Sequence, residues 1–358
     1  MNEARTRALR YLVRGAVQGV GFRPFVYREA TARALRGWTI NTPEGVEILI
    51  AGPPWQIDDF DAALRYNPPP AARIESIEAS PCEDSDLPAT FEIRASQLEG
   101  AHSATILPDL AMCTDCLRDI SDPANRRYRY PFTNCINCGP RYSIMLGLPY
   151  DRDRTTMRAF TMCEGCRAEY ENPADRRFHA QPNACPLCGP HLSLWNRDGQ
   201  TIAERDEALK LAAQQIKDGR IVAVKGIGGF HLLVDATNDE AVRELRRRKH
   251  REEKPFAVMV RDVAAANAHA NVAPEEQRWL TSPAAPIVLL KRKSTNIAPS
   301  VAPDNPWLGI FLPYSPLHHL LMDEIQSPVV ATSGNFSDEP IVTDEHEALD
   351  RLGGFCDY

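Results

Sequence analysis

The first residues whose types and spacing suit a reactive site form a glycine-rich segment near the start of the chain. It reads Arg14-Gly15-Ala16-Val17-Gln18-Gly19-Val20-Gly21-Phe22-Arg23 and lies between a predicted strand and the start of a predicted helix. Glycines let backbone N–H groups converge here, and the helix start adds partial positive charge, so the segment favours an anion. Arg23, in the first turn of that helix, can hold phosphate oxygens through its planar guanidinium. A tight connection without a ligand is the alternative, and no Gly-Lys-Ser/Thr follows that would make a Walker loop.

A second polar residue, Asn41, ends a predicted strand that can run beside this segment. An amide there can orient a water for attack on phosphorus, and a turn-forming Asn before Thr42-Pro43 is the alternative. The glycine-rich segment together with Gly37-Trp38-x-x-Asn41-x-x-Glu44-Gly45-Val46 resembles the acylphosphatase signature. The resemblance implies that Arg23 holds the phosphate and that Asn41 positions the nucleophilic water. It also implies a phosphate-binding loop made of Gly15, Val17, Gln18, Gly19, Val20 and Gly21.

Eight of the 10 cysteines form four C-x₂-C pairs inside a segment that occurs twice, about 50 residues apart. Thiolate pairs at this spacing suit tetrahedral Zn²⁺. Disulfides would need an oxidising compartment and explain neither the pairs nor the repeat, and a redox C-x-x-C motif does not come fourfold. We expect two structural zinc ions, one per repeat, although spacing leaves open a swap of pairs between repeats. The nearby His179 and His191 are then surface or packing residues. The predicted ligands are Cys113, Cys116, Cys135 and Cys138 for one ion and Cys163, Cys166, Cys185 and Cys188 for the other.

A third group of polar residues lies in the last part of the chain. A basic cluster (245–256) precedes one predicted strand, and another strand leads into a Ser-Gly-Asn turn (333–335). A solvated helix face and an ordinary turn are the alternatives. Lys249-x-Arg251-x-x-Lys254-Pro255-Phe256 with Ser333-x-Asn335 resembles the YrdC-like domain, which binds ATP and forms carbamoyl-adenylate-type products. The resemblance implies ATP with Mg²⁺, bound by Lys249, Arg251, Lys254, Ser333 and Asn335, and Lys225 and His231 are further candidates for the same pocket.

The elements that must position these groups divide the chain into three parts. The order β-α-β-β-α-β over residues 8–95 is that of a ferredoxin-like split βαβ unit. The cysteine-rich part shows no regular hydrophobic periodicity of helices or strands. The last part has an α/β pattern, which predicts a twisted mixed sheet with helices. The expected fold class is α+β and α/β multidomain: an acylphosphatase-like domain (1–97), a tandem zinc-finger domain (105–195) and a YrdC-like nucleotide-binding domain (199–358).

Composition excludes several other classes. The 358 residues carry a formal charge of −7, which argues against a dedicated nucleic-acid binder. No apolar run approaches the length of a membrane span. The start, Met1–Arg5, lacks the apolar core of a secretory signal, so we expect a cytoplasmic protein.

The three parts in this order, with the extension Arg23-Pro24-Phe25-Val26, resemble the HypF family, the carbamoyltransferases of [NiFe]-hydrogenase maturation. The resemblance implies that carbamoyl phosphate is hydrolysed to carbamate and phosphate at the Arg23/Asn41 site. Carbamate then reacts with ATP to give carbamoyl-AMP, and a further domain transfers the carbamoyl group to a cysteine of the partner HypE. A zinc-finger interaction or RNA-binding module and a stand-alone acylphosphatase are the alternatives.

The end of the chain departs from the family pattern. It stops at residues 353–358, where the YrdC-like domain would ordinarily continue, and it shows no histidine-rich motif of a transfer domain. We therefore expect a shortened form with an incomplete last domain, an open sheet edge, and no transfer to HypE by this chain alone.

Overall fold

The computed structural model describes residues 6–83, 87–97, 99, 105, 108–293, 296–336 and 339–358. Met1–Arg5, on which the expected absence of a secretory signal rests, lies outside the described residues. The chain forms two compact units, unit 1 (Met1–Asp109 and Asn134–Gly189) and unit 2 (Leu110–Thr133 and Pro190–Tyr358). The predicted division into three domains stays a prediction.

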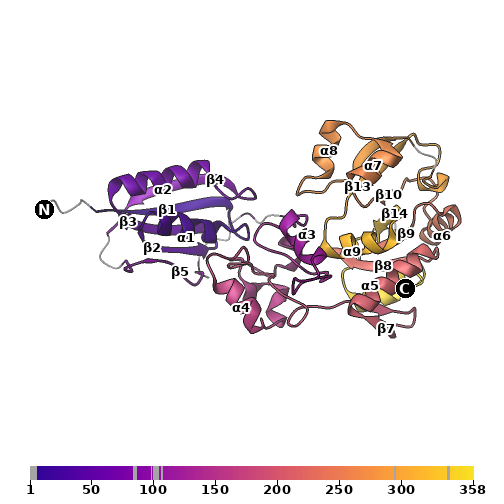
Figure 1. Ribbon diagram of the computed structural model, residues 1–358, viewed down its shortest axis with the longest axis horizontal. Helices are drawn as coiled ribbons and strands as arrows, with labels where there is room; N and C mark the ends of the chain where they lie inside the picture. The colour runs from indigo at the N-terminus through magenta and orange to yellow at the C-terminus, as the bar shows by residue number, and fades with distance from the viewer. Residues whose placement is uncertain are drawn as a thin grey trace. The chain divides into compact units, whose positions relative to one another are not determined.

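Unit 1 begins with the ferredoxin-like arrangement that the sequence predicts (Figure 1). Its five-stranded sheet has the order β4-β1-β3-β2-β5. Every other residue of β1 is buried, among them Tyr11 and Val13, because one face of the sheet packs against the two helices. The elements are β1 (Arg7–Ala16), α1 (Phe22–Ala32), β2 (Arg36–Thr42), β3 (Gly45–Gly52), α2 (Pro54–Tyr66), β4 (Arg73–Pro81) and β5 (Phe91–Ile93).

The connection from β1 to α1 is fixed by glycines in the left-handed region. Gly15 has φ 116°, and a Cβ there would lie 2.3 Å from the carbonyl oxygen of Arg73 on β4. Gly21 has φ 73° and is the N-cap of α1. The two glycines therefore allow β1 to end and α1 to begin within a few residues, which places Arg23 beside the loop.

The two cysteine segments share one backbone design. Each begins with a short helix, α3 (Thr114–Ser121) in the first and α4 (Glu164–Glu171) in the second. Short 3₁₀ helices, η1 (Tyr142–Ile144), η2 (Arg152–Arg154) and η3 (Thr156–Ala159), lie between the two segments. Cysteine pairs and turns thus replace periodic structure, as the sequence predicts.

Unit 2 contains a seven-stranded mixed sheet of order β11-β12-β13-β10-β14-β9-β8 and a separate β6–β7 hairpin. Helices cover both faces of this sheet, since Leu232 and Val234 of β9 belong to one buried cluster and Leu233 to the other. The strands are β6 (Ser193–Trp195), β7 (Thr201–Glu204), β8 (Val222–Gly226), β9 (Gly229–Asp235), β10 (Ala257–Met259), β11 (Ala270–Asn271), β12 (Val288–Arg292), β13 (Trp307–Phe311) and β14 (Val329–Ser333). The helices are α5 (Arg205–Lys217), α6 (Asp239–Lys249), α7 (Val263–His269), α8 (Pro274–Leu280), η4 (Pro299–Val301), α9 (Pro316–Ile325) and α10 (Glu345–Leu352).

The sequence predicts an open sheet edge near the end of the chain, and this prediction is wrong for the edge strand β8. The backbone N–H of Ala223 on the edge strand β8 donates to the carbonyl oxygen of Tyr358 at 2.9 Å. The N–H of Asp357 donates to the carbonyl oxygen of Ile221 at 2.7 Å. The last residues of the chain therefore cover the edge of β8 and satisfy its backbone groups.

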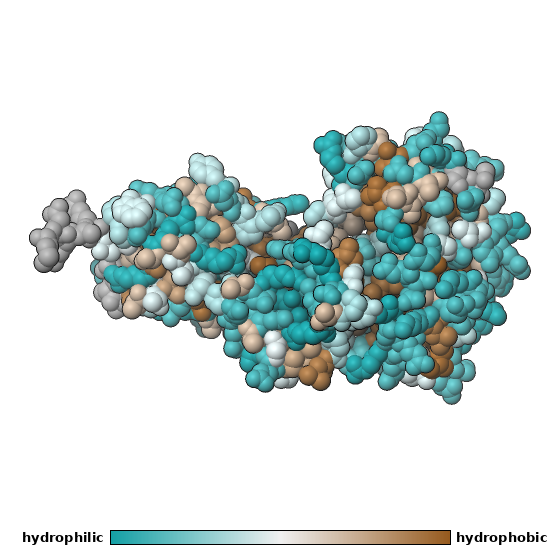
Figure 2. Space-filling model, in the orientation of Figure 1, coloured by the Kyte–Doolittle hydropathy of each residue, from teal (hydrophilic) through white to brown (hydrophobic). Residues whose placement is uncertain are grey.

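The surface of both units is mostly hydrophilic on the face that Figure 2 shows, with apolar side chains gathered over the β13–α7 region of unit 2. Within the described residues, no helix combines the length and the apolar character that crossing a bilayer requires.

Candidate active site

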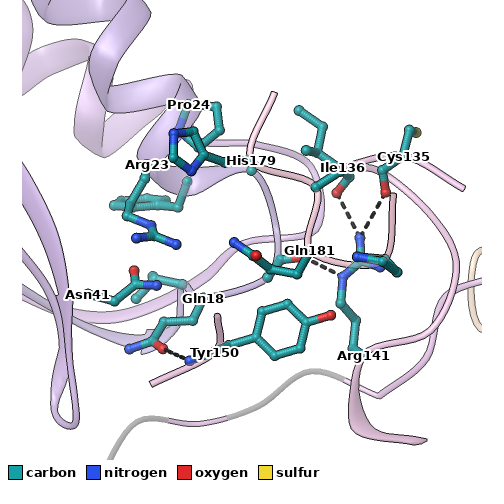
Figure 3. A pocket seen from close by; sticks show the side chains of 16 residues that line it. Gln18, Arg23, Pro24, Asn41, Cys135, Ile136, Arg141, Tyr150, His179 and Gln181 are labelled. Carbon is teal, nitrogen blue, oxygen red and sulfur yellow. Dashed lines mark hydrogen bonds between the residues drawn. The ribbon is translucent and has the colours of Figure 1, made fainter. Parts of the chain in front are cut away.

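Unit 1 contains a small cavity lined by the glycine-rich loop and by the cysteine-rich part of the same unit (Figure 3). It encloses about 20 Å³, which is room for about one water molecule. The lining residues predicted from the sequence are Val17, Gln18, Gly19, Gly21, Arg23 and Asn41. Arg23 and Asn41 therefore face a common cavity, as a site built from both requires.

The guanidinium of Arg23 has two side-chain partners. Its Nη2 donates to Asp151 Oδ1 at 2.6 Å and its Nη1 to Ser96 Oγ at 3.2 Å. The side chain of Arg23 is 9% exposed and that of Asp151 is 30% exposed. The Asp151 carboxylate thus takes up Nη2, one of the guanidinium donors that an anionic ligand could use.

The loop beside Arg23 presents backbone donors. No side chain of the described residues caps the N-terminus of α1, whose first turn leaves N–H groups without intrahelical partners. The N–H groups of Gln18, Gly19, Val20 and Gly21 also meet no protein acceptor among the described residues. Converging free N–H groups with a guanidinium form a site suited to phosphate oxygens.

Asn41 supplies an acceptor that the protein leaves unused. Asn41 is 1% exposed, and its Oδ1 has no hydrogen-bond partner among the residues that the structure describes. Because a buried polar oxygen without a partner costs free energy, such a group is a candidate for a bound water or ligand. The geometry suits an amide that accepts a hydrogen bond from water.

Three members of the predicted phosphate loop, Gly15, Gln18 and Val20, have other roles. The Gln18 side chain is fully used, since Nε2 donates to the carbonyl oxygens of Thr42 and Gly45 at 2.7 and 2.8 Å and Oε1 accepts from Tyr150 N at 2.9 Å. Gly15 and Val20 do not line the cavity: Gly15 makes the close approach to β4, and Val20 is buried in the hydrophobic core. Only the backbone of Gln18 remains for a ligand.

The opposite wall of the cavity was not predicted from the sequence. Arg141, Tyr150, His179 and Gln181 all line it and come from the cysteine-rich part of the chain. Arg141 is 2% exposed and donates to several backbone carbonyl oxygens, including those of Gly19 and Ile136. It therefore ties the glycine-rich loop to the segment that carries Cys135 and Cys138.

Burial keeps two titratable groups of this wall, His179 and Tyr150, neutral. Burial and the neighbouring Arg23 guanidinium lower the pKa of His179 to about 4. Burial raises the pKa of Tyr150 to about 12. At neutral pH His179 is therefore an uncharged imidazole and Tyr150 an uncharged phenol, and the charged side chains in the lining are those of Arg23 and Arg141.

The eight predicted metal ligands form two groups, Cys113, Cys116, Cys135 and Cys138, and Cys163, Cys166, Cys185 and Cys188, whose sulfur atoms lie within 4.8 Å of one another in each group. In the second group the S···S distances are 3.7 Å for Cys163–Cys185, 3.8 Å for Cys185–Cys188 and 3.6 Å for Cys166–Cys188. Zn–S bonds of about 2.3 Å place tetrahedral ligands about 3.8 Å apart, so these distances fit zinc. The grouping also shows that the C-x₂-C pairs are not exchanged between the repeats, because the four cysteines of each group come from one repeat. Four thiolates leave no open position, which makes the zinc structural.

Unit 2 contains a larger cavity of about 580 Å³. Of the five nucleotide-binding residues predicted from the sequence, Arg251 and Ser333 line it. His231 also lines this cavity, whereas Lys225 forms an ion pair with Glu345 at 2.6 Å. Sequence analysis missed Tyr314 and His318, which lie beside His231 in the same wall.

Lys249, Lys254 and Asn335 lie outside the lining of this cavity. Lys249 is 7% exposed, and its Nζ donates to the carbonyl oxygens of Ser333 and Asn335 at 2.7 and 2.8 Å. Burial and the nearby Arg251 lower the pKa of Lys249 to about 8. Lys249 therefore braces the Ser333–Asn335 turn, and Lys254 is exposed.

Comparison with protein families divides the chain into matched segments. Residues 9–93 match the acylphosphatase family, and residues 112–145 and 162–195 match the HypF finger. Residues 214–358 match the Sua5/YciO/YrdC family, described as telomere recombination.

Individual proteins match over nearly the whole chain. It is 52% identical to the carbamoyltransferase HypF of Synechocystis sp. over 348 residues, which are 96% of this chain and 45% of that protein. It is 51% identical to the carbamoyltransferase HypF of Rhodobacter capsulatus over 98% of this chain and 46% of that protein. A crystal structure of full-length HypF in the phosphate- and nucleotide-bound form matches with a TM-score of 0.92 and 46% identity, over 99% of this chain and 46% of that chain. The chain thus spans a little under half the length of the relatives it matches.

Proposed function

The chain belongs to the HypF family of carbamoyltransferases, and we propose that its cavity around Arg23 and Asn41 hydrolyses carbamoyl phosphate to carbamate and phosphate. One observation carries the proposal. An unused buried acceptor, Asn41 Oδ1, lines the same cavity as a guanidinium and the uncapped N-terminus of α1. This pairs a water-orienting group with an anion-binding group.

The proposed reaction is an attack of water on phosphorus. Arg23 and the N–H groups of the loop hold the phosphate oxygens, and Asn41 Oδ1 accepts a hydrogen bond from the attacking water. The new bond forms between the water oxygen and phosphorus. The bond between phosphorus and the acyl oxygen breaks, and its electron pair leaves on carbamate. The proton lost by the water passes to phosphate or to bulk solvent.

Substrate binding requires a rearrangement of the cavity wall. The enclosed 20 Å³ holds about one water, which is too small for carbamoyl phosphate. Asp151 Oδ1 lies 2.6 Å from Arg23 Nη2, and its carboxylate has the same sign of charge as the substrate. We propose that Asp151 leaves Arg23 when the phosphate group enters.

The second step of the proposal concerns unit 2. Carbamate would react there with ATP, supplied as its Mg²⁺ complex, to give carbamoyl-AMP and pyrophosphate. Arg251 would neutralise charge that develops on the phosphates, with Ser333 in the same cavity. Lys249 would hold the turn that carries Ser333 and Asn335, and Lys254 would approach the phosphates from the exposed end of its segment.

The remaining parts of the proposal follow from the family. The carbamoyl group would finally reach a cysteine of HypE through a part of the longer relatives that this chain does not match. The division at 1–97, 105–195 and 199–358 assigns hydrolysis, zinc binding and nucleotide binding to successive domains. A cytoplasmic location suits eight thiols that serve as metal ligands.

Phosphate release from carbamoyl phosphate by the purified chain tests the first step. We expect Arg23→Ala and Asn41→Ala to lower kcat/KM by about 100-fold or more, as for removal of other preorganised groups. Arg33→Ala is the matched control, since Arg33 also lies at α1 but binds Glu29 and Asp59. Equal activity in Arg23→Ala and Arg33→Ala would remove the proposed site.

ATP–pyrophosphate exchange that depends on carbamoyl phosphate tests the second step. We expect Arg251→Ala to abolish the exchange and to leave phosphate release unchanged. Arg243→Ala is the control, because Arg243 is exposed on α6 and pairs with Asp239. Exchange that survives in Arg251→Ala would contradict this part of the proposal.

A further inference from the structure

We propose that Gln181, from the second cysteine segment, binds the acyl group of the substrate in the Arg23/Asn41 cavity. The inference rests on the acylphosphatase activity proposed above and adds a residue from outside the acylphosphatase fold. Gln181 is 3% exposed and lines the cavity. Figure 3 shows its amide pointing towards the side of the cavity that carries Arg23 and Asn41.

The hydrogen bonds of Gln181 fix which end of its amide is available. Its Oε1 accepts from the backbone N–H of Arg152 at 2.9 Å and from the Tyr170 hydroxyl at 2.9 Å. Its Nε2 meets no protein acceptor among the described residues. Because the oxygen is occupied twice, the amide cannot turn over without losing both bonds, and the free group is a donor.

The two partners of Oε1 are themselves held in place. Arg152 Nη1 donates to the carbonyl oxygen of Gln181 at 2.6 Å, and Arg152 Nη2 donates to that of Phe160 at 2.7 Å. Burial raises the pKa of Tyr170, so its hydroxyl keeps the proton that it donates. Arg152 and Tyr170 are positioning residues, and the donor of Gln181 is preorganised before any substrate arrives.

Comparison of the two cysteine segments shows that the finger fold does not require this amide. The position of Gln181 corresponds to Pro131 in the first segment, and the position of Tyr170 corresponds to Ile120. The backbone is nevertheless the same, since Arg129 N donates to Ile120 O at 2.9 Å and His179 N to Tyr170 O at 3.0 Å. A polar pair, Gln181 and Tyr170, therefore takes the place of an apolar pair in the second segment.

The position of Gln181 indicates that its Nε2 donates to the acyl part of the substrate. The phosphate oxygens are matched by Arg23 and the loop N–H groups on the other wall, so the acyl group points away from that loop. Its carbonyl oxygen is an acceptor, and it gains negative charge as the P–O bond breaks and the acyl group leaves as a carboxylate. A neutral N–H donor stabilises that charge without the strong attraction of a cation, which would retain the product.

Kinetics on the full chain with Gln181→Met test the proposal, because methionine keeps the side-chain volume and removes the amide. We expect kcat/KM for carbamoyl phosphate to fall about 10- to 100-fold. The inhibition constant of inorganic phosphate, which has no acyl group, should change less than about twofold. Gln214→Met, the same change at an exposed site on α5, is the control. Zinc content of two ions per chain shows that the variant is folded.

Tyr170→Phe is a second variant that keeps Gln181 and removes one of its two anchors. We expect a smaller loss, about 3-fold in kcat/KM, again with phosphate inhibition unchanged. An unchanged kcat/KM in Gln181→Met would overturn the inference, and so would a parallel loss of phosphate affinity, which would assign Gln181 to the phosphate group. If the unmodified chain releases no phosphate from carbamoyl or acetyl phosphate, the proposed function itself fails.

Discussion

Arg129 and His179 occupy equivalent positions in the two cysteine segments and share a left-handed backbone, with φ 55° and 53°. Each ends the turn that follows the short helix of its segment. The two side chains have different roles. Arg129 forms ion pairs with Asp206 and Glu324 within unit 2, and His179 lines the Arg23/Asn41 cavity within unit 1. One backbone device thus presents a different side chain in each unit, which is a use of duplication beyond metal binding.

Arg129→Met tests the role of this position in unit 2. The side chain is 19% exposed and holds both carboxylates at 2.7 Å. Removing it leaves Glu324 without this cation and Asp206 with Lys210 alone, so we expect unit 2 to lose about 1–2 kcal/mol of stability. Chemical denaturation measures the loss. Arg118→Met, which removes an exposed pair with Asp115, should cost less than about 0.5 kcal/mol, and equal losses would contradict the prediction.

Asp151→Asn tests whether the carboxylate on Arg23 competes with the substrate. The change keeps the shape of the side chain and removes its charge, so phosphate no longer has to displace an anion from the guanidinium. We expect KM for carbamoyl phosphate to fall about 3- to 10-fold with kcat nearly unchanged. Asp153→Asn is the control, because Asp153 is an exposed acid of the 3₁₀ helix η2 that Asp151 precedes. A higher KM in Asp151→Asn would instead show that the pair holds Arg23 in its working position.

The sequence predicted the glycine-rich loop and the ferredoxin-like order because both follow from local rules. Gly15, Gly19 and Gly21 all have positive φ, which side chains rarely tolerate, and the turn chemistry of such residues can be read directly. The metal ligands could also be predicted from the sequence alone, because two cysteines at C-x₂-C spacing can bind the same ion. The order β-α-β-β-α-β predicted over residues 8–95 matches β1, α1, β2, β3, α2 and β4 of the structure.

The features that sequence analysis missed depend on contacts between distant residues. Strand β9 was not predicted from the sequence; Gly228 and Gly229, both with positive φ, close a tight hairpin after β8, and Gly226 pairs with Gly229. Tyr150 and Gln181 line the cavity only because the chain folds back onto the glycine-rich loop. A sequence signal for Gln181 did exist, because the alignment of the two repeats places Pro131 opposite it.

Removal of the second zinc should affect the Arg23/Asn41 cavity as well as stability. Asn183, which follows the cavity-lining segment, donates from Nδ2 to Cys166 O at 3.0 Å, so the zinc ligands and the wall share one backbone. We expect Cys185→Ser to lower zinc content from two ions to about one and to abolish phosphate release. A metal-binding dye and a phosphate assay measure the two together. Cys82→Ser should change neither, because Cys82 belongs to neither ligand group; full activity in a one-zinc variant would contradict the coupling.

His318 should make unit 2 less stable in mild acid. Its side chain is 1% exposed, and burial together with His231 and His319 lowers its pKa to about 3. An unfolded histidine binds a proton below about pH 6.5, whereas the folded one stays neutral, so stability is full above pH 6.5 and falls as the pH drops towards 3. Between pH 7 and pH 5 this single group should lower the free energy of unfolding by about 2 kcal/mol.

The variant His318→Gln tests this prediction, because it removes the titration. We expect the variant to lose about 2 kcal/mol less than the unmodified chain over the same pH range in denaturant titrations. The neighbouring His319, whose pKa burial lowers to about 4, adds its own loss to both proteins and cancels from the difference. Parallel pH profiles for the two proteins would show that His318 is not held neutral in the fold.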